Sequence, residues 1–139
     1  MCTSFKVALL NGEMDFSSDT SQSFKIALYT SSATLNAETT AYSTTNEASG
    51  TGYTAGGNTL TIATNPTNDT SSTVAYLNFS DTTWTSSSIT ARGALIYKTG
   101  GTTPAVAVLD FGSDKTTSSS TFTVTFPTSA VTSAIIRIA

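Results

Sequence analysis

The sequence predicts one antiparallel all-β domain spanning residues 1–139, and three observations support this prediction. Apolar and polar residues alternate over short stretches with the period of two that is typical of strands. Clusters of glycine, asparagine and proline separate these stretches. The chain contains 30 threonines and 21 serines, and threonine favours the half-exposed face of a sheet. About eight strands with regular turns indicate a β-sandwich, for which a jelly roll is one possible topology.

The alternation is clearest at residues 24–29 and 121–126, where each stretch has one apolar face and one more polar face. Gly93 interrupts an apolar stretch and indicates a bulge or a tight packing site. We expect residues 112–115 to form a turn. In chain order, the expected strands are residues 5–9, 24–29, 59–64, 73–79, 89–98, 105–111, 121–126 and 134–138.

The segment between residues 30 and 57 lacks both strand and helix periodicity. Residues 35–42 are expected to form a loop with at most one short helical turn, and residues 43–57 a long exposed connection. Glu38 and Glu47 are then most simply solvated loop charges. No window of the sequence predicts a helix of appreciable length.

Composition argues against several classes of partner. Charged residues make up 11% of the chain, the net charge is -3, and the six lysines and arginines are scattered, so we expect no nucleic-acid partner. No basic cluster, amphipathic helix or long apolar run predicts a membrane partner. No signal-peptide pattern opens the sequence, so we expect synthesis in a cytoplasm. Cys2 is the single cysteine and cannot form an internal disulfide.

The chain has no histidine, which removes the usual general base and the commonest metal ligand. With one cysteine, a structural zinc site and a Ser-His-Asp arrangement are both excluded. Asp110 and Asp114 flank Gly112, where a turn whose aspartates bond their own backbone is the simplest interpretation. We therefore expect a non-enzymatic protein without metal or cofactor.

Two residues allow two interpretations each. Trp84 could stack on a sugar ring together with Tyr42 and Tyr53, or it could fold over one end of the core. Arg92, inside the most apolar strand, could pair with Asp110 on the neighbouring strand or contact another subunit.

Five sequence blocks follow one another in order along the chain. They are Phe24-Lys25-Ile26-Ala27-Leu28-Tyr29-Thr30, Gly52-Tyr53-Thr54-Ala55-Gly56-Gly57, Ile89-Thr90-Ala91-Arg92-Gly93-Ala94-Leu95-Ile96-Tyr97, Ala105 through Lys115, and Ala134-Ile135-Ile136-Arg137-Ile138-Ala139. Together these blocks resemble a family of small virion structural proteins of tailed bacteriophages, many of them from aquatic phages, including those of cyanobacteria. The resemblance covers roughly residues 5–139.

This resemblance implies a particle component. The favoured expectation is a capsid decoration, or cement, protein on the exterior of the virion, made in the cytoplasm of a bacterial host. Its expected partners are the major capsid protein and further copies of itself, as a homotrimer. The alternative is a tail, fibre or baseplate module that binds a host glycan.

The expected contact residues follow from these two hypotheses. For the capsid or subunit interface, we expect residues 5–16 to form an anchoring strand that adds to a neighbour's sheet edge. The named interface residues are Phe5, Lys6, Phe16, Tyr42, Tyr53 and Arg92. The named residues for the glycan alternative are Trp84, Tyr42 and Tyr53.

Overall fold

The computed structural model describes residues 1–17, 19 and 21–139, and this part of the chain contains one short helix and nine strands. Every strand pairing among them is antiparallel, so the predicted all-β class is confirmed. The elements are α1 Thr3–Leu10, β1 Phe24–Tyr29, β2 Asn58–Leu60, β3 Ile62–Asn68, β4 Ala75–Phe79, β5 Thr82–Ser87, β6 Thr90–Lys98, β7 Ala105–Thr116, β8 Ser120–Val124 and β9 Ile136–Ile138.

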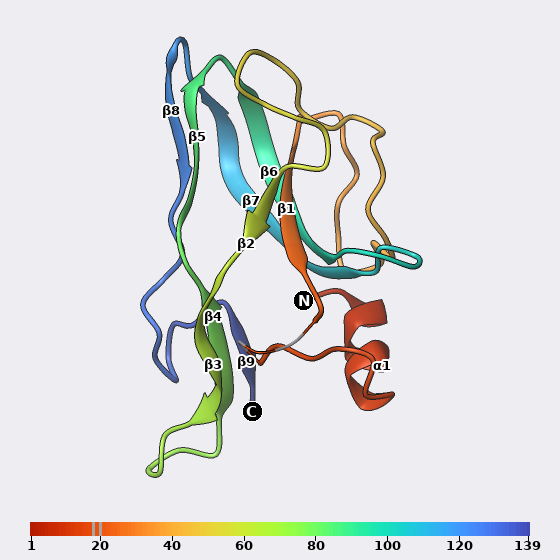
Figure 1. The fold of residues 1–139 in the computed structure, drawn as a ribbon, viewed down its shortest axis with the longest axis vertical. Helices are drawn as coiled ribbons and strands as arrows, with labels where there is room; N and C mark the ends of the chain where they lie inside the picture. The colour runs from red at the N-terminus through yellow and green to blue at the C-terminus, as the bar shows by residue number, and fades with distance from the viewer. Residues whose placement is uncertain (18, 20) are drawn as a thin grey trace.

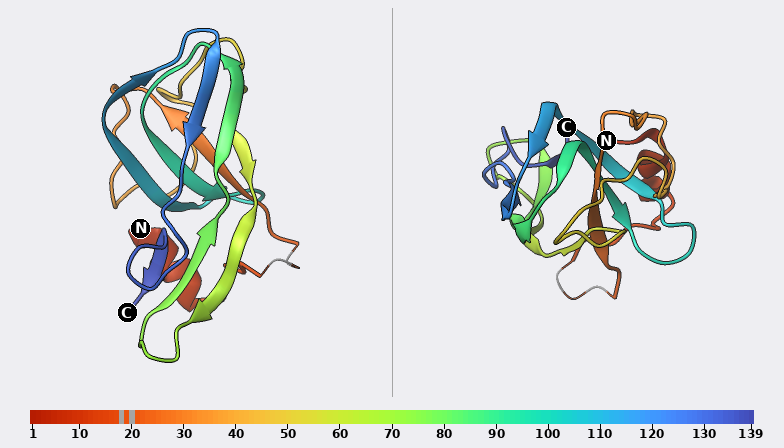
Figure 2. Two further views of the ribbon diagram at one scale, coloured as in Figure 1. Left: turned by 90° about the vertical axis from the view of Figure 1, so that its left-hand side faces the viewer. Right: turned by 90° about the horizontal axis from the view of Figure 1, so that it is seen from above.

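The strands form a four-stranded sheet in the order β2-β1-β6-β7, a three-stranded sheet β3-β4-β9 and a two-stranded ribbon β5-β8. At one end of the elongated molecule, the ribbon lies against the four-stranded sheet as the second layer of a sandwich (Figures 1 and 2). The three-stranded sheet and α1 occupy the other end (Figure 1). The arrangement supports the predicted sandwich and does not confirm the jelly-roll topology.

Strand β1 lies at the centre of the four-stranded sheet. It pairs with β6 over its whole length, from Phe24↔Lys98 to Tyr29↔Gly93. The sequence predicts that the more polar face of this strand is exposed to solvent. That prediction is wrong, because Ala27 and Tyr29 on this face are buried. The reason is the connection 30–57, which is packed against β1: Ala48 N–H donates to Leu28 O at 2.8 Å, and the Tyr29 hydroxyl donates to Ser43 O.

An aromatic cluster joins the two ends of the molecule. Phe16 stacks on Phe24 with ring centroids 4.3 Å apart, and Phe79 of β4 meets both rings at 6.2–6.3 Å. Phe126, which follows β8, packs on Phe79 at 5.9 Å. The alternation at residues 121–126 is confirmed, because Phe122, Val124 and Phe126 are buried and the intervening threonines are exposed.

Three local predictions are wrong. Residues 5–9 belong to helix α1, so the expected anchoring strand at 5–16 does not exist. Residues 112–115 are not a turn, because β7 continues through them to Thr116, with Gly112 at a φ of +76°. Residues 82–87 form strand β5, although their sequence pattern predicts no strand. Gly93 was predicted correctly: the β6–β7 register shifts beside it, and a Cβ there would lie 2.5 Å from Leu109 O.

Candidate interaction surface

Helix α1 is short and is fixed at both ends by the rest of the fold. Before it, Cys2 is buried and donates its N–H to Val106 O of β7, and Thr3 N–H donates to Ala37 O. After it, Gly12 takes a φ of +71° and donates to Leu9 O, while Glu13 N–H donates to Ala8 O. This pair of hydrogen bonds around a left-handed glycine is the Schellman ending of a helix.

The helix is apolar on more sides than it can bury. Residues Val7 to Leu10 are four consecutive apolar residues, and at 3.6 residues per turn they encircle the helix axis. Phe5 and Ala8 face the core. Val7 and Leu10 therefore face solvent.

The exposed large apolar side chains of the described residues lie at this end of the molecule. They are Met1, Val7, Leu10 and Ile138, with 44%, 55%, 88% and 46% of their surface exposed. Ile138 belongs to β9, which lies beside α1 at the same end (Figure 1). We call the surface formed by Met1, Lys6, Val7, Leu10, Arg137 and Ile138 the α1–β9 face.

Two hollows adjoin this face. One, of about 420 Å³, lies between the segment from α1 to Phe16 and the sheet β3-β4-β9. The second, of about 320 Å³, lies between α1 and the end of β9, and we call it the β9 groove. Its lining consists of Met1, Phe5, Lys6, Leu9, Leu10, Arg137, Ile138 and Ala139.

The β9 groove is apolar with a positively charged rim. Lys6 and Arg137 line it, together with Met1 and Ala139, whose terminal ammonium and carboxylate groups carry opposite charges, and no aspartate or glutamate side chain is among its lining residues. Neither cation forms an ion pair within the described part of the chain; Arg137 donates one hydrogen bond, to Val131 O at 3.1 Å. The groove therefore offers apolar contacts together with two cations that can meet negative charge.

The predicted interface residues of the N-terminal segment are only partly on this face. Phe5 and Phe16 are 1% and 3% exposed and contact each other edge to face, with centroids 5.9 Å apart. They are core residues, which corrects their assignment to an interface. Lys6 is exposed on α1 and belongs to the face. Sequence reasoning missed Val7, Leu10 and Ile138, although the run of apolar residues before Asn11 was visible.

Tyr42 and Tyr53 were expected to be exposed contact residues, but their hydroxyls are used internally. Both donate to the carboxylate of Glu47, each at 2.7 Å, and Gly56 N–H donates to the same carboxylate at 2.7 Å. Tyr42 also stacks on Tyr97 with centroids 4.6 Å apart. Glu47 is thus the centre of a hydrogen-bonded cluster, and its assignment as a solvated loop charge is wrong.

This tyrosine cluster predicts sensitivity to alkaline pH. Burial raises the pKa of Tyr29 to about 12, and burial also raises the pKa of Tyr42, Tyr53 and Tyr97. In the unfolded chain these hydroxyls ionise near pH 10, as free tyrosine does. The stability they contribute is present below about pH 10 and is lost as the pH rises through the folded-state values. Most of the tyrosinate absorbance and the circular dichroism should therefore change together between about pH 10 and 12. Tyr76 of β4 lies outside the cluster, so tyrosinate forming at more than this one of the five tyrosines while the fold persists would contradict the prediction.

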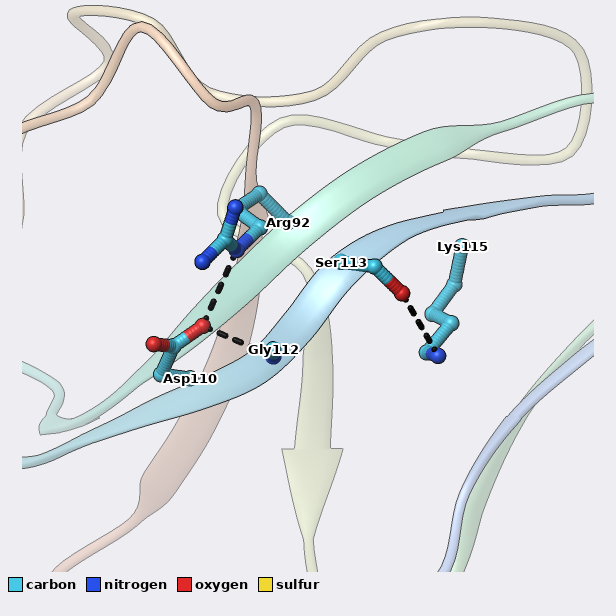
Figure 3. A network of polar contacts seen from close by, with 5 residues as sticks. All are labelled: Arg92, Asp110, Gly112, Ser113 and Lys115. Atoms are coloured by element: carbon cyan, nitrogen blue, oxygen red, sulfur yellow. Dashed lines mark hydrogen bonds and ion pairs between the residues drawn. The ribbon is translucent and has the colours of Figure 1, made fainter.

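Arg92 pairs with Asp110 across strands β6 and β7, as one of its two interpretations predicted (Figure 3). Its Nε donates to Asp110 Oδ1 at 3.0 Å, and Gly112 N–H donates to the same oxygen at 2.8 Å. Lys115, on the same strand as Asp110, donates to Ser113 instead (Figure 3). The Arg92 and Asp110 side chains are 42% and 67% exposed, so solvent screens this ion pair.

The Arg92 pair carries a second pH prediction. The hydrogen bond from Arg92, and then that from Gly112, lowers the pKa of Asp110. An NMR titration of the carboxyl carbon should show Asp110 titrating below the usual aspartate range, and Arg92→Ala should move the pKa back toward that range. Because the folded-state pKa is depressed, the associated stability is present above the ordinary aspartate pKa and is lost as the pH falls through the depressed value. An unchanged titration in Arg92→Ala would contradict the pairing.

Trp84 lies on the inner side of β5 and is 4% exposed. Its ring contacts Phe122 edge to face at 6.0 Å and Tyr53 at 5.9 Å. The interpretation that it folds over the core is confirmed, and the exposed stacking surface that the glycan alternative requires is missing. Its indole Nε1 is buried without a hydrogen-bond partner in the described structure.

The remaining observations identify no second site with defined chemistry. Within residues 1–17, 19 and 21–139, no three potential metal-binding side chains of the histidine, cysteine, aspartate or glutamate type cluster together. The helix found there is too short to cross a bilayer. Comparisons with protein-family models, with curated proteins and with solved structures returned no match.

Proposed function

We propose that this chain is a non-enzymatic structural protein of a tailed-bacteriophage particle. In this proposal it decorates the exterior of the capsid, assembles as a homotrimer and holds neighbouring copies of the major capsid protein together. The observation that supports a structural role is the α1–β9 face, where the exposed Met1, Leu10 and Ile138 line one groove and Val7 is exposed on the same helix as Leu10. The choice of a phage particle rests on the sequence blocks described above.

An apolar face of this kind favours contact with another protein chain. Burying apolar surface contributes roughly 25 cal/mol per Å², and contiguous apolar patches on soluble monomers are often sites of association. The sequence is rich in threonine and serine and has a net charge of -3, and hydroxyl groups with a mild negative charge suit a protein that must remain soluble before assembly. A protein clamp also needs no catalytic groups, and the absence of histidine fits that role.

The alternative role in a tail, fibre or baseplate has less support. It needs aromatic rings available to a sugar, whereas Trp84 is buried and the Tyr42 and Tyr53 hydroxyls are held by Glu47. Arg92, named for the interface, is exposed enough to contact a neighbour, but its guanidinium is already paired with Asp110.

Leu10→Asp tests this proposal, with Thr123→Asp on the exposed face of β8 as the matched control. Wild-type protein added to particles of the encoding phage that lack this gene product should sediment with the shells. Because burying a leucine contributes about 1.5–3 kcal/mol, Leu10→Asp should bind at least about tenfold more weakly, and the control should bind as wild type does. Failure of the wild type to bind shells, or equal binding by Leu10→Asp, would refute the proposal.

A further inference from the structure

Strand β9 has one free edge. It is the last strand of the sheet β3-β4-β9. Among the described residues it pairs with β4 alone, through Ala75↔Ile138, Tyr76↔Arg137 and Leu77↔Ile136. In an antiparallel pair, backbone groups point alternately toward and away from the neighbouring strand. Part of the β9 backbone therefore presents N–H and C=O groups on the side away from β4, and such an edge can accept another strand.

The β9 groove adjoins this strand, because its lining combines residues of α1 with Arg137, Ile138 and Ala139 at the end of β9. Phe5 and Leu9 of α1 form one wall, and Arg137 and Ile138 form the other. A strand added to β9 would therefore lie beside an apolar helix surface, and every second side chain could enter the groove. Addition of a strand to an open sheet edge is a recurring mode of peptide recognition, in which the groove selects alternate side chains.

The charge of the rim specifies the chemistry of such a strand. Two of the six cations of the chain, Lys6 and Arg137, line the groove, and neither is neutralised by an ion pair in the described part of the chain. In contrast, Arg92 is paired with Asp110, and Lys98 donates to Glu13 O at 2.7 Å. Acidic side chains on the incoming strand would complement the rim, whereas basic ones would be repelled.

A second copy of this chain is a poor source of that strand. Glu13 and Asp15 are the only two carboxylates in the sequence separated by one residue. The apolar residues that alternate with them, Met14 and Phe16, are buried in their own core. The chain's one alternating acidic and apolar segment is therefore already in use, which favours a different protein as the donor.

We propose that the β9 groove binds an extended segment of a neighbouring particle protein in which apolar residues alternate with acidic ones, and that this segment adds to β9 as a fourth strand of the sheet β3-β4-β9. The apolar side chains enter the groove between α1 and β9. The acidic side chains meet Lys6 and Arg137. This inference rests on the proposed role of the α1–β9 face in assembly and names the chemistry of its partner.

Peptide binding to the full ¹⁵N-labelled chain tests the inference directly. The probe is the peptide acetyl-Thr-Val-Glu-Val-Glu-Val-Thr-amide, and the control replaces both glutamates with lysine. We expect the acidic peptide to shift the amide resonances of β9 and α1, and to bind roughly fivefold to tenfold more tightly than the lysine peptide at low salt. Equal affinities, or shifts confined to another free edge such as that of β7, would overturn the inference.

Variants and a modified probe separate the charge from the strand geometry. The double variant Lys6→Glu and Arg137→Glu should reverse the preference between the two peptides. The single variant Lys6→Glu leaves the hydrogen bond from Arg137 to Val131 O intact and should reduce this preference. N-methylation of the valines in one peptide and of the glutamates in another removes the backbone donors of one strand edge in each, so one of the two changes should abolish binding. Unchanged binding of both methylated peptides would show that no strand is added and would overturn the inference.

The shell-binding experiment distinguishes the two proposals. If Leu10→Asp loses shell binding but the acidic peptide is not bound selectively, the assembly role is retained and the acidic strand is rejected. If the peptide is bound selectively but the wild type has no affinity for shells, the groove chemistry is retained and the capsid role is rejected.

Discussion

The Glu47→Ala variant is expected to lose about 3 kcal/mol of unfolding free energy. The Glu47 carboxylate accepts hydrogen bonds from Tyr42, Tyr53 and Gly56, each at 2.7 Å. Its removal leaves two half-buried hydroxyls and one buried N–H without their acceptor. Each hydrogen bond to a charged group contributes about 1.5–3 kcal/mol, and this contribution is smaller where water can replace the lost acceptor. Urea denaturation followed by circular dichroism would measure the change.

Glu38→Ala is the matched control for this variant. Glu38 lies in the same connection, and its carboxylate accepts one exposed hydrogen bond, from the Thr3 hydroxyl at 3.2 Å. Its replacement should change the unfolding free energy by less than about 0.5 kcal/mol. Glu47→Gln keeps one acceptor oxygen and should lose less than Glu47→Ala. Equal stabilities of Glu47→Ala and Glu38→Ala would show that the cluster does not hold the connection.

The Gly57→Ala variant is expected to lose more than about 3 kcal/mol, or to fail to fold. Gly57 has a φ of +66°, and a left-handed conformation costs a residue with a side chain about 1–2 kcal/mol. In addition, a Cβ at this position would lie 1.8 Å from Ile26 O of β1. Because that atom belongs to the backbone of a central strand, relief would require separating β1 from the start of β2.

Gly101→Ala separates these two contributions. Gly101 has a φ of +56°, but a Cβ there would meet no atom within 4 Å. Its replacement should cost only the conformational term, about 1–2 kcal/mol. Thermal unfolding of both variants would measure the difference, and similar losses in the two would contradict the close approach of Gly57 to β1.

The sequence predicted the strands well where alternation and turn residues agreed. Residues 24–29 and 121–126 alternate over their whole length, and both stretches contain a strand of the structure. Strand β5 was missed because its buried positions include Thr82 and Ser87 beside Trp84, so its pattern carries little apolar contrast. Strand β7 was predicted too short because a glycine such as Gly112 often marks the end of a strand. In the structure, β7 continues through Gly112 to Thr116.

Helix α1 was missed for a different reason. Its residues lack a regular apolar stripe, and its stability depends on tertiary contacts of Cys2 and Thr3 with Val106 and Ala37, which no local pattern reveals. The role of Glu47 was hidden in the same way, because its partners converge only after the connection folds. The α1–β9 face could be predicted only in part: the apolar run of α1 was visible, but its proximity to β9 depends on residues more than a hundred positions apart.

A cryo-electron microscopy reconstruction of the particle that contains this chain would test the proposed assembly role of the α1–β9 face most directly. The proposal predicts density for this chain on the outer shell of a phage particle, with α1 and β9 turned toward the major capsid protein and an extended segment of that protein beside β9. A particle in which the chain is absent from the shell, or bound with α1 and Leu10 facing solvent, would contradict the assembly role of this face.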